Sequence, residues 1–302
     1  MKKQELIQTF FQHKNKLTLS NPIYQKNVHD LIKWLIETDH VHEDRTTKTL
    51  FPASKQVTAH IITRQQTTIA GLEEISYLLT TYTTVTITDA VHDGDTLEAN
   101  QTIMKITGDL KEILIYERIM LNILQRLSGI ATETKKIISS LPNDNPMIAA
   151  TRKTVWGPLD KKAVAIGGGV THRLNLSDGI LVKDNHLIFL KPEQALQTLC
   201  KQIEKTLIEI EVEDEQHVEQ LITNFTNTST TNVLGILLDN FTPERAKKVI
   251  AKINDHPNII SEASGGITPE NINDWADTGV DLISLGALTH SPKAADVSLE
   301  II

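Results

Sequence analysis

The chain has 302 residues, enough for one large barrel or two domains, and a formal net charge of −8. The isoelectric point near 5.8 leaves no domain-wide basic surface, which argues against a nucleic-acid partner. The single cysteine, Cys200, excludes an internal disulfide and fits a reducing compartment. The N-terminal sequence lacks an apolar segment of signal-peptide length, and the apolar stretches are too short to span a bilayer. We therefore expect a cytoplasmic protein with no membrane partner.

The first part of the chain predicts a small, largely antiparallel β domain. A helix is expected at 27–37. Segments rich in Thr, Val and Ile follow, separated by turn signals, at 57–63, 67–70, 82–89 and 102–106. Residues 110–139 then predict one or two helices, with a break at Ser128-Gly129.

From Met147 onward the pattern changes to short apolar strands that stop at polar or glycine-bearing tips, with helical stretches between them. The expected strands and tips are 147–153, 179–185, 208–213, 233–240, 259–266 and 282–288. Their spacing is typical of repeated βα units with a parallel sheet. We predict an α/β protein with a parallel β/α barrel, closed or incomplete.

Ligand-contacting residues of such a barrel lie where the strands end. The strand tips carry Arg152, Lys153, Lys183, Asp184, Glu211, Asp239, Ser264, Gly265 and Gly286. In addition, His172 and Arg173 join the cations of the 150–186 segment around the triple glycine 167–169. Because an acidic chain concentrates cations here, we expect a small ligand with several negative charges.

Several of these residues have an ordinary structural alternative. Arg152-Lys153 could be a solvated face, and Lys183 could be a lysine that extends its charge from a buried strand to water. Asp239-Asn240 could be a turn before the next helix, whose start is predicted at Thr242. The fact that six consecutive tips all carry such groups favours function.

Two further tips leave a choice open. Glu211 lies in the run IEIEVE with Glu209 and Glu213, and periodicity alone does not choose the functional residue. The run 264–266, followed by Thr268-Pro269-Glu270, predicts a helix N-terminus whose backbone N–H groups suit a phosphate.

Long motifs in the same order resemble the quinolinate phosphoribosyltransferase family, also called carboxylating nicotinate-nucleotide pyrophosphorylases, over nearly the whole chain. They are EDRTT (43–47), ERIMLNILQRLSGIAT (117–132), TRKT (151–154), GGG with THR (167–173), LVKDNH (181–186), EIEVE (209–213), LLDN (237–240), EASGGIT (262–268) and ISLGALTHSPKAADVSLEI (283–301). The resemblance implies an N-terminal α/β sandwich over 1–116, rejoined by the tail 289–302, and an α/β barrel over 117–288. It also implies a homodimer, or a higher oligomer, with composite active sites at the barrel mouths.

The implied reaction joins quinolinate to phosphoribosyl pyrophosphate, with Mg²⁺, and gives nicotinate mononucleotide, pyrophosphate and CO₂ for de novo NAD biosynthesis. The resemblance assigns Glu211 and Asp239 to the ribose hydroxyls and Mg²⁺. Lys153 and Lys183 are the further catalytic candidates, because a lysine near the decarboxylating ring can stabilise the carbanion or deliver a proton. The sequence does not choose between them. The expected basic pocket comprises Arg118 from the neighbouring subunit with Arg152, Lys153, His172, Arg173 and Lys183. The expected phosphate-binding residues are Ser264, Gly265, Gly266 and Gly286, and Thr151, Ala287 and His290 complete the substrate-binding set.

The sequence departs from the commoner family pattern over 155–162, where a loop usually reads Pro-Gly and a basic residue. We expect Lys161 or Lys162 to serve instead. Two alternatives to the quinolinate enzyme remain: the paralogue of the same fold associated with molybdate-transport operons, and a non-catalytic sensor of pyridine nucleotides. The LVKDNH and RLSGIAT segments favour the quinolinate enzyme over the paralogue, and a mere anion sensor would not need Glu211 and Asp239.

Overall fold

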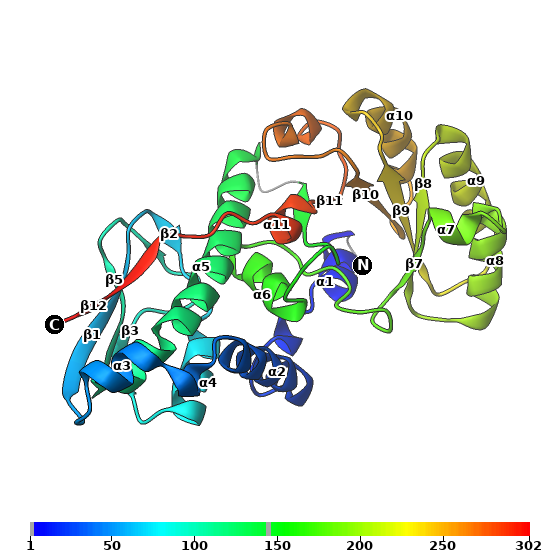
Figure 1. Cartoon of the computed structure of the whole chain (residues 1–302). Coiled ribbons are helices and arrows are strands. Elements are labelled where there is room, and N and C mark those ends of the chain that lie inside the picture. Colours follow the sequence, from blue (N-terminus) through cyan, green and yellow to red (C-terminus); the bar gives the residue numbers. More distant parts are fainter. Residues whose placement is uncertain (1–2, 143–145) are drawn as a thin grey trace. The chain divides into compact units, whose positions relative to one another are not determined.

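The structure, a computed structural model, describes residues 3–142 and 146–302 and divides into two compact units (Figure 1). The barrel unit comprises 1–13, 136–153 and 169–289, and the sandwich unit comprises 14–135, 154–168 and 290–302. These units differ from the predicted ranges 1–116 and 117–288. The first helix belongs with the barrel because it packs on the barrel core, whereas 117–135 and 154–168 belong with the sandwich.

The sandwich unit is built on a four-stranded antiparallel sheet in the order β12-β1-β5-β3. The strands are β1 (Gln56–Thr63), β3 (Thr86–Ala90), β5 (Thr102–Asp109) and β12 (Val297–Ile301). The C-terminal segment therefore supplies an edge strand, with Ala59 of β1 opposite Ile301 of β12. A separate two-stranded ribbon pairs β2 (Thr67–Thr68) with β4 (Thr96–Leu97).

The helices of this unit are more extensive than the sequence predicted. They are α2 (Pro22–Thr38), α3 (Arg45–Leu50), α4 (Leu72–Tyr82), α5 (Leu110–Ser140, whose last turn lies in the barrel unit), α6 (Pro158–Ile166) and two 3₁₀ turns, η1 (Lys14–Lys16) and η2 (Val41–Glu43). The predicted 82–89 strand is wrong at its start, since Tyr82 ends α4 and β3 begins at Thr86.

The predicted break at Ser128-Gly129 is also wrong, because α5 runs through it. Ser128 Oγ accepts the Ala70 N–H at 3.0 Å. Gly129 makes room for another chain segment: a Cβ atom there would lie 2.1 Å from the carbonyl oxygen of Lys293. The glycine thus serves a close backbone approach inside a helix.

A buried ion cluster joins α6 to α2 and α4. Lys162 Nζ donates to Glu74 Oε1 at 2.6 Å and also pairs with Glu73. The Tyr24 hydroxyl donates to the same Glu74 oxygen at 2.6 Å. Burial lowers the pKa of Lys162, but the charges of Glu74 and Glu73 outweigh burial and raise it. Lys162 is therefore a buried structural cation. This finding contradicts the expectation that Lys162 replaces the basic residue that the 155–162 segment lacks.

We expect Lys162→Met to cost about 3–5 kcal/mol of unfolding free energy, because it leaves the fully buried Glu74 without its cation. The matched control is Lys252→Met, which breaks an exposed pair with Glu219 and should cost no more than about 1 kcal/mol. Urea denaturation of both variants measures the difference. Equal losses would show that the buried cluster contributes no more than a surface pair.

The barrel unit contains six parallel strands in the order β6-β11-β10-β9-β8-β7, which confirms the predicted parallel barrel pattern. They are β6 (Met147–Ala149), β7 (Ile180–Val182), β8 (Leu207–Val212), β9 (Val233–Asp239), β10 (Ile259–Ser264) and β11 (Leu282–Ser284). Val170 extends the sheet beyond β6 by one parallel bridge to Ala149. Among the described residues no ladder joins Val170 to β7, so the barrel is incomplete.

Three amphipathic helices lie along the outer side of β8, β9 and β10 (Figure 1). They are α8 (Pro192–Gln202), α9 (Glu215–Thr226) and α10 (Pro243–Asn254). Two of them begin at side-chain caps: Asp214 accepts the His217 N–H, and Thr242 accepts the Arg245 N–H. The buried residues of α10 recur at helical spacing, namely Ala246, Val249, Ile250 and Ile253.

Helix α1 (Lys3–Phe11) packs into the end of the barrel where the strands begin. Its Leu6, Ile7 and Phe11 form one buried cluster with apolar residues of the barrel sheet, namely Ala149, Val170, Leu207, Val233, Ile260 and Leu282. The shorter elements of this unit are α7 (Asp184–Leu187), α11 (Ala287–His290, whose last residue belongs to the sandwich unit) and the 3₁₀ turn η4 (Ile272–Trp275). Within the described residues, we find no helix with the length and apolar character that crossing a bilayer requires.

Candidate active site

Strand β8 shows how the barrel interior is layered. Leu207, Glu209 and Glu211 are alternate residues of one strand and therefore share a face. Leu207 belongs to the apolar cluster around α1, Glu209 contacts His172, and Glu211 contacts Lys183. The interior thus changes along the strand from an apolar layer to a buried polar layer and then to a polar rim.

The rim carries two carboxylates at the ends of neighbouring strands. Glu211 is the last of the three alternate residues of β8 described above, and its Oε2 accepts from Lys183 Nζ at 2.6 Å. Asp239 ends β9, and its Oδ2 accepts from the Asn240 side chain at 2.7 Å. Burial raises the pKa of Asp239, and the charge of Glu211 raises it further, whereas Lys183 and Lys153 lower it. Two carboxylates that repel each other in this way favour a bound cation.

The cations of the rim lie close enough to repel one another. Burial and then the charge of Arg152 lower the pKa of Arg173, whose Nη1 donates to the Gly179 carbonyl at 3.1 Å. Arg152 and Lys153 are exposed in the loop after β6. Thr151 Oγ1 accepts the Lys153 N–H at 3.1 Å, and the Lys153 carbonyl accepts from the Thr289 hydroxyl at 2.7 Å. These bonds tie the loop to α11, which also carries Ala287.

The glycine-bearing tip of β10 packs tightly against the tip of β9. The Asn240 N–H donates to the Ser264 carbonyl at 2.9 Å, and a Cβ on Gly265 would lie 2.3 Å from Asn240 Oδ1. Gly265 also has φ 83°, so both the close approach of Asn240 and the left-handed backbone require glycine here. A hollow of about 250 Å³ opens beside this tip and is lined by Asn240, Phe241, Thr242, Pro243, Gly265, Gly266, Ile267, Asn271, Asp274 and Trp275.

The helix predicted to begin at Thr268-Pro269-Glu270 is wrong. The structure has a turn there, in which the Thr268 N–H donates to Asn271 Oδ1 at 2.8 Å, and then only the four-residue η4. The Asn271 side chain returns to the Gly266 carbonyl at 3.0 Å. Local side-chain bonds have replaced the first helical turn. Any phosphate at this tip would meet loop backbone instead of a helix N-terminus.

Two of the expected site residues lie in the sandwich unit. Arg118 is exposed on α5, and His290 is exposed beside Ser291, to whose hydroxyl its Nδ1 lies 2.6 Å. The other expected residues lie in the barrel unit, and all but His172 are on its rim: Thr151, Arg152, Lys153, Arg173, Lys183, Glu211, Asp239, Ser264, Gly265, Gly266, Gly286 and Ala287.

The unusual 155–162 segment folds around a buried aspartate. Arg126 Nε and Nη2 donate to the two oxygens of the Asp160 carboxylate at 2.8 and 2.7 Å. The same carboxylate accepts from the Thr154 hydroxyl and, at 3.2 Å, from the Trp156 N–H. The Arg126 guanidinium lies 5.2 Å from the Trp156 ring centroid, in cation–π range. Lys161 is buried in the adjoining helix. This segment is therefore anchored within its own unit.

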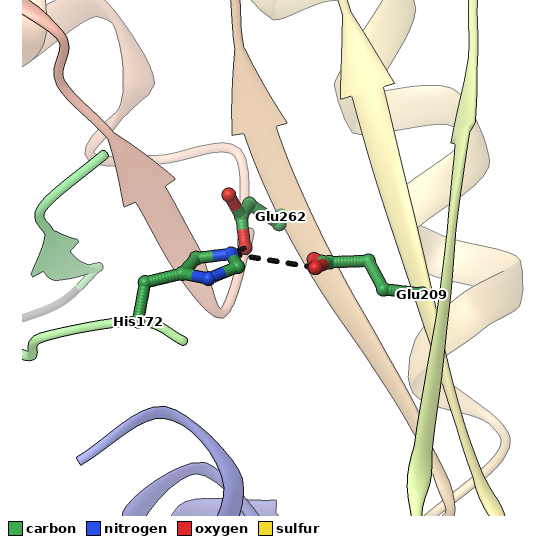
Figure 2. A group of neighbouring side chains, drawn as sticks. All are labelled: His172, Glu209 and Glu262. Carbon is green, nitrogen blue, oxygen red and sulfur yellow. Dashed lines mark hydrogen bonds and ion pairs between the residues drawn. The ribbon is translucent and has the colours of Figure 1, made fainter. Parts of the chain in front are cut away.

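The buried polar layer gathers His172, Glu209 and Glu262 (Figure 2). His172 Nε2 lies 3.3 Å from Glu209 Oε2 and 3.2 Å from Glu262 Oε2. The Ser284 hydroxyl donates to the other oxygen of Glu262. The Phe11 and His172 rings form a T-shaped pair, with centroids 5.0 Å apart and planes at 86°. Both glutamates are about 1% exposed, so the layer is closed to solvent.

The two glutamates of this layer have opposite pKa shifts. Burial raises the pKa of Glu209 to about 7, helped by the charge of Glu262. Burial also raises the pKa of Glu262, but the contacts of its carboxylate with His172 and Ser284 prevail and lower it to about 2. For His172, burial lowers the pKa, whereas the charges of Glu262 and Glu209 raise it.

Sequence reasoning did not predict Glu262 or Ser284 as site residues and could not choose among the glutamates of IEIEVE. The structure buries Glu209 and Glu211 on the inner face and leaves Glu213 exposed. A usable signal existed. In a parallel sheet the strands are buried on both faces, so charged residues that alternate along such a strand lie inside the protein. Each of them then needs a partner there. Gly235, opposite Glu209, is a second sign, since a Cβ there would lie 3.1 Å from Glu209 Cγ.

Fold and rim together define a class: an α/β enzyme whose parallel barrel presents cations, carboxylates and glycine backbone to anionic, phosphate-bearing substrates. Models of known families identify it further. Residues 44–128 match the N-terminal domain of quinolinate phosphoribosyl transferase, and residues 130–300 match its C-terminal domain. The chain belongs to the quinolinate phosphoribosyltransferase family.

Individual relatives agree with this assignment. The chain is 35% identical over 281 residues to a probable carboxylating nicotinate-nucleotide pyrophosphorylase of Methanothermobacter thermautotrophicus, covering 90% of this chain and 98% of the relative. It is 36% identical over 282 residues to the corresponding protein of Methanocaldococcus jannaschii, covering 90% and 96%. The solved nicotinate-nucleotide pyrophosphorylase of Francisella tularensis superposes with a TM-score of 0.80 at 30% identity, covering 92% of this chain and 96% of that structure.

Proposed function

We propose that this chain transfers the phosphoribosyl group of phosphoribosyl pyrophosphate to the ring nitrogen of quinolinate and releases pyrophosphate and CO₂, as a step of NAD biosynthesis. Family membership supports the reaction. The observation that carries the assignment to a site is the rim, where the Glu211 and Asp239 carboxylates lie within electrostatic range of Lys153 and Lys183. That combination suits a sugar phosphate beside a dicarboxylate.

In this proposal Arg152, Arg173 and Lys183 bind the two adjacent carboxylates of quinolinate. Arginine forks can take a carboxylate bidentately, and lysine adds a point charge. The mutual repulsion of Arg152 and Arg173 is relieved when a dianion lies between them. Lys183 would then exchange its present partner, Glu211, for substrate. The backbone of the Ser264–Gly266 tip and of Gly286 would receive phosphate oxygens.

The rim residues fit the Mg²⁺ that the family implies. Mg²⁺ prefers oxygen ligands and is usually held by one or two carboxylates together with substrate phosphates. Glu211 and Asp239 offer such carboxylates on neighbouring strands, and the charge of Glu211 disfavours the ionised form of Asp239, which a bound cation would stabilise. When bound, Mg²⁺ would neutralise charge on the pyrophosphate leaving group.

The bond changes follow from these placements. The quinolinate nitrogen forms a bond to the ribose anomeric carbon as the bond from that carbon to pyrophosphate breaks. The ribose then carries positive charge, which the carboxylates of Glu211 and Asp239 oppose. The pyridinium product loses CO₂, its ring nitrogen stabilises the electron pair left behind, and a proton takes the vacated position. Lys153 and Lys183 are the candidates to deliver that proton.

The direct test incubates the purified protein with quinolinate, phosphoribosyl pyrophosphate and Mg²⁺ and follows nicotinate mononucleotide. Product formation supports the proposed reaction. Absence of turnover with tight binding of the mononucleotide would instead support the sensor. Absence of both would leave the paralogue of molybdate operons as the better assignment.

We expect a strong preference for quinolinate over nicotinate, with kcat/KM for nicotinate lower by about 10²- to 10³-fold. A pocket that holds Arg152, Arg173 and Lys183 has more cations than one carboxylate can neutralise, and an unpaired cation in a desolvated site is costly. Initial rates with each acid at saturating phosphoribosyl pyrophosphate measure the ratio. Comparable values for the two acids would contradict the assignment of these cations to the dicarboxylate.

A further inference from the structure

Both ring nitrogens of His172 have partners inside the barrel. Nδ1 accepts the backbone N–H of Arg173 at 2.8 Å. Nε2 faces Glu209 at 3.3 Å and Glu262 at 3.2 Å (Figure 2). The ring is therefore a link between the buried glutamates on one side and the backbone that carries Arg173 on the other.

This arrangement fixes where the imidazole proton resides. A neutral imidazole has one N–H, and since Nδ1 accepts the Arg173 N–H, the proton is on Nε2. The imidazolium that the two carboxylates favour electrostatically would place a second N–H against the Arg173 N–H, and the hydrogen bond at Nδ1 opposes it. The two carboxylates raise the pKa of His172, but an imidazolium cannot accept the Arg173 N–H. The hydrogen bond at Nδ1 decides between the two forms, and we assign the neutral ring with its proton on Nε2.

The same assignment excludes an attractive alternative. The ligand atoms of His172, Glu209 and Glu262 lie within 4.8 Å of one another, as in many metal sites. A metal at Nε2 needs the lone pair of that nitrogen, and a protonated Nε2 has none to offer. In this cluster the Nε2–H group faces the Glu209 and Glu262 carboxyl groups, and the Ser284 hydroxyl donates to the other oxygen of Glu262.

We propose that Glu209 and Glu262 are positioning residues for the dicarboxylate pocket and act through the His172 ring. They hold the proton on Nε2, which leaves Nδ1 free to accept the Arg173 N–H. The inference rests on the proposed function, because that function assigns quinolinate to the Arg173 guanidinium.

The backbone explains why such support is needed. His172 has φ 53°, in the left-handed region that few residues other than glycine adopt, although histidine, asparagine and aspartate adopt it more often than the rest. The next residue, Arg173, is buried beside the cationic Arg152, which repels it. A conformation that is unfavourable on both counts persists only when its surroundings fix it. The Nδ1 hydrogen bond supplies that constraint where the chain enters Arg173.

The first test is nitrogen-15 NMR of the full-length protein with labelled histidine rings. The His172 signals, identified among the eleven histidines as those lost in His172→Asn, should show Nε2 protonated and Nδ1 unprotonated. Addition of Zn²⁺ should leave them unchanged. Protonation of both nitrogens, protonation of Nδ1 alone, or a Zn²⁺-dependent shift at Nε2 would overturn the inference. This readout does not depend on enzymatic activity.

The second test is a double-mutant cycle between Glu262 and His172. In Glu262→Gln the Ser284 hydroxyl keeps the amide oxygen, so the amide NH₂ group faces His172 Nε2 and favours the wrong tautomer. We expect KM for quinolinate to rise about tenfold, with kcat and KM for phosphoribosyl pyrophosphate changed far less. His172→Asn has no Nε2 proton to hold, so adding Glu262→Gln to it should change KM little. Additive effects would overturn the inference.

A matched pair separates positioning from direct substrate contact. Asn tolerates the left-handed backbone and places an acceptor near the Nδ1 position, whereas Gln places its amide near the Nε2 position and offers no acceptor at Nδ1. His172→Asn should keep KM for quinolinate within about threefold and His172→Gln should raise it about tenfold. Equal impairment would mean that the ring itself contacts substrate, which would overturn the proposal.

The control is Glu219→Gln on α9, which is exposed and paired with Lys252 and should leave every parameter unchanged. If the unmodified protein forms no nicotinate mononucleotide, the proposed function fails, and the NMR experiment still decides the tautomer. If the protein is active but the cycle is additive, only the positioning role fails.

Discussion

Asp239→Ala should lower kcat by about two to three orders of magnitude while quinolinate affinity stays within about twofold. Asp239 ends β9, beside Glu211 and near Lys183 and Lys153, but the proposed dicarboxylate cations are other residues. Its removal takes away negative charge that would oppose positive charge on the ribose and one of two carboxylates available to Mg²⁺. Single-turnover rates and calorimetric titration with quinolinate measure the two quantities separately.

The control for this substitution is Asp255→Ala, since Asp255 is an exposed residue that follows α10. It should change neither kcat nor quinolinate affinity. If calorimetry instead finds that Asp239→Ala abolishes quinolinate binding, then Asp239 organises the dicarboxylate pocket, and its assignment to ribose and metal is wrong.

Arg118→Ala and Lys153→Ala should each be nearly inactive alone and should regain activity when mixed. Arg118 is exposed on α5 of the sandwich unit, whereas Lys153 is on the rim of the barrel unit. We propose that Arg118 enters the site of a neighbouring subunit in a two-fold dimer. Random pairing of the two variants then leaves both lesions in one site of each mixed dimer and the other site intact, which restores about a quarter of all sites.

The experiment unfolds the two variants together, refolds them in equal amounts and measures nicotinate mononucleotide formation. Mass spectrometry confirms the mixed dimers, and each variant refolded alone provides the background. If mixed dimers form without recovered activity, then Arg118 acts in its own subunit or outside the site.

The sequence predicted the barrel well because a parallel strand is a local pattern. Each of the six strands is a short apolar run with a polar or glycine-bearing end, and all six appear in one parallel sheet. Prediction failed where distant contacts decide local structure. Ser128-Gly129 contains two weak helix formers, yet a helix passes through them because Ala70 and the Lys293 backbone meet it there.

The buried layer shows the same limit at the site. The alternation within IEIEVE places Glu209 and Glu211 on the same face of the strand. It does not show which of the two is exposed to water. That choice depends on His172, which comes from a loop outside the strand, and on Glu262 two strands away in the sheet. Likewise, Thr268-Pro269-Glu270 has the composition of a helix start, and Asn271 diverts it into a turn.

The pairing of β12 with β1 has a consequence for how the protein is made. The sandwich sheet takes its strands from 56–109 and then from 297–301, so it stays incomplete while roughly 160 residues that follow α5 are synthesised. At about 5–20 residues per second, the hydrogen-bonding edge of β1 is exposed for on the order of ten seconds on the ribosome. During that time the edge can pair with any extended segment nearby, including one from another nascent chain. The sheet of this unit is therefore completed only when β12 becomes available, and until then aggregation competes with the native state.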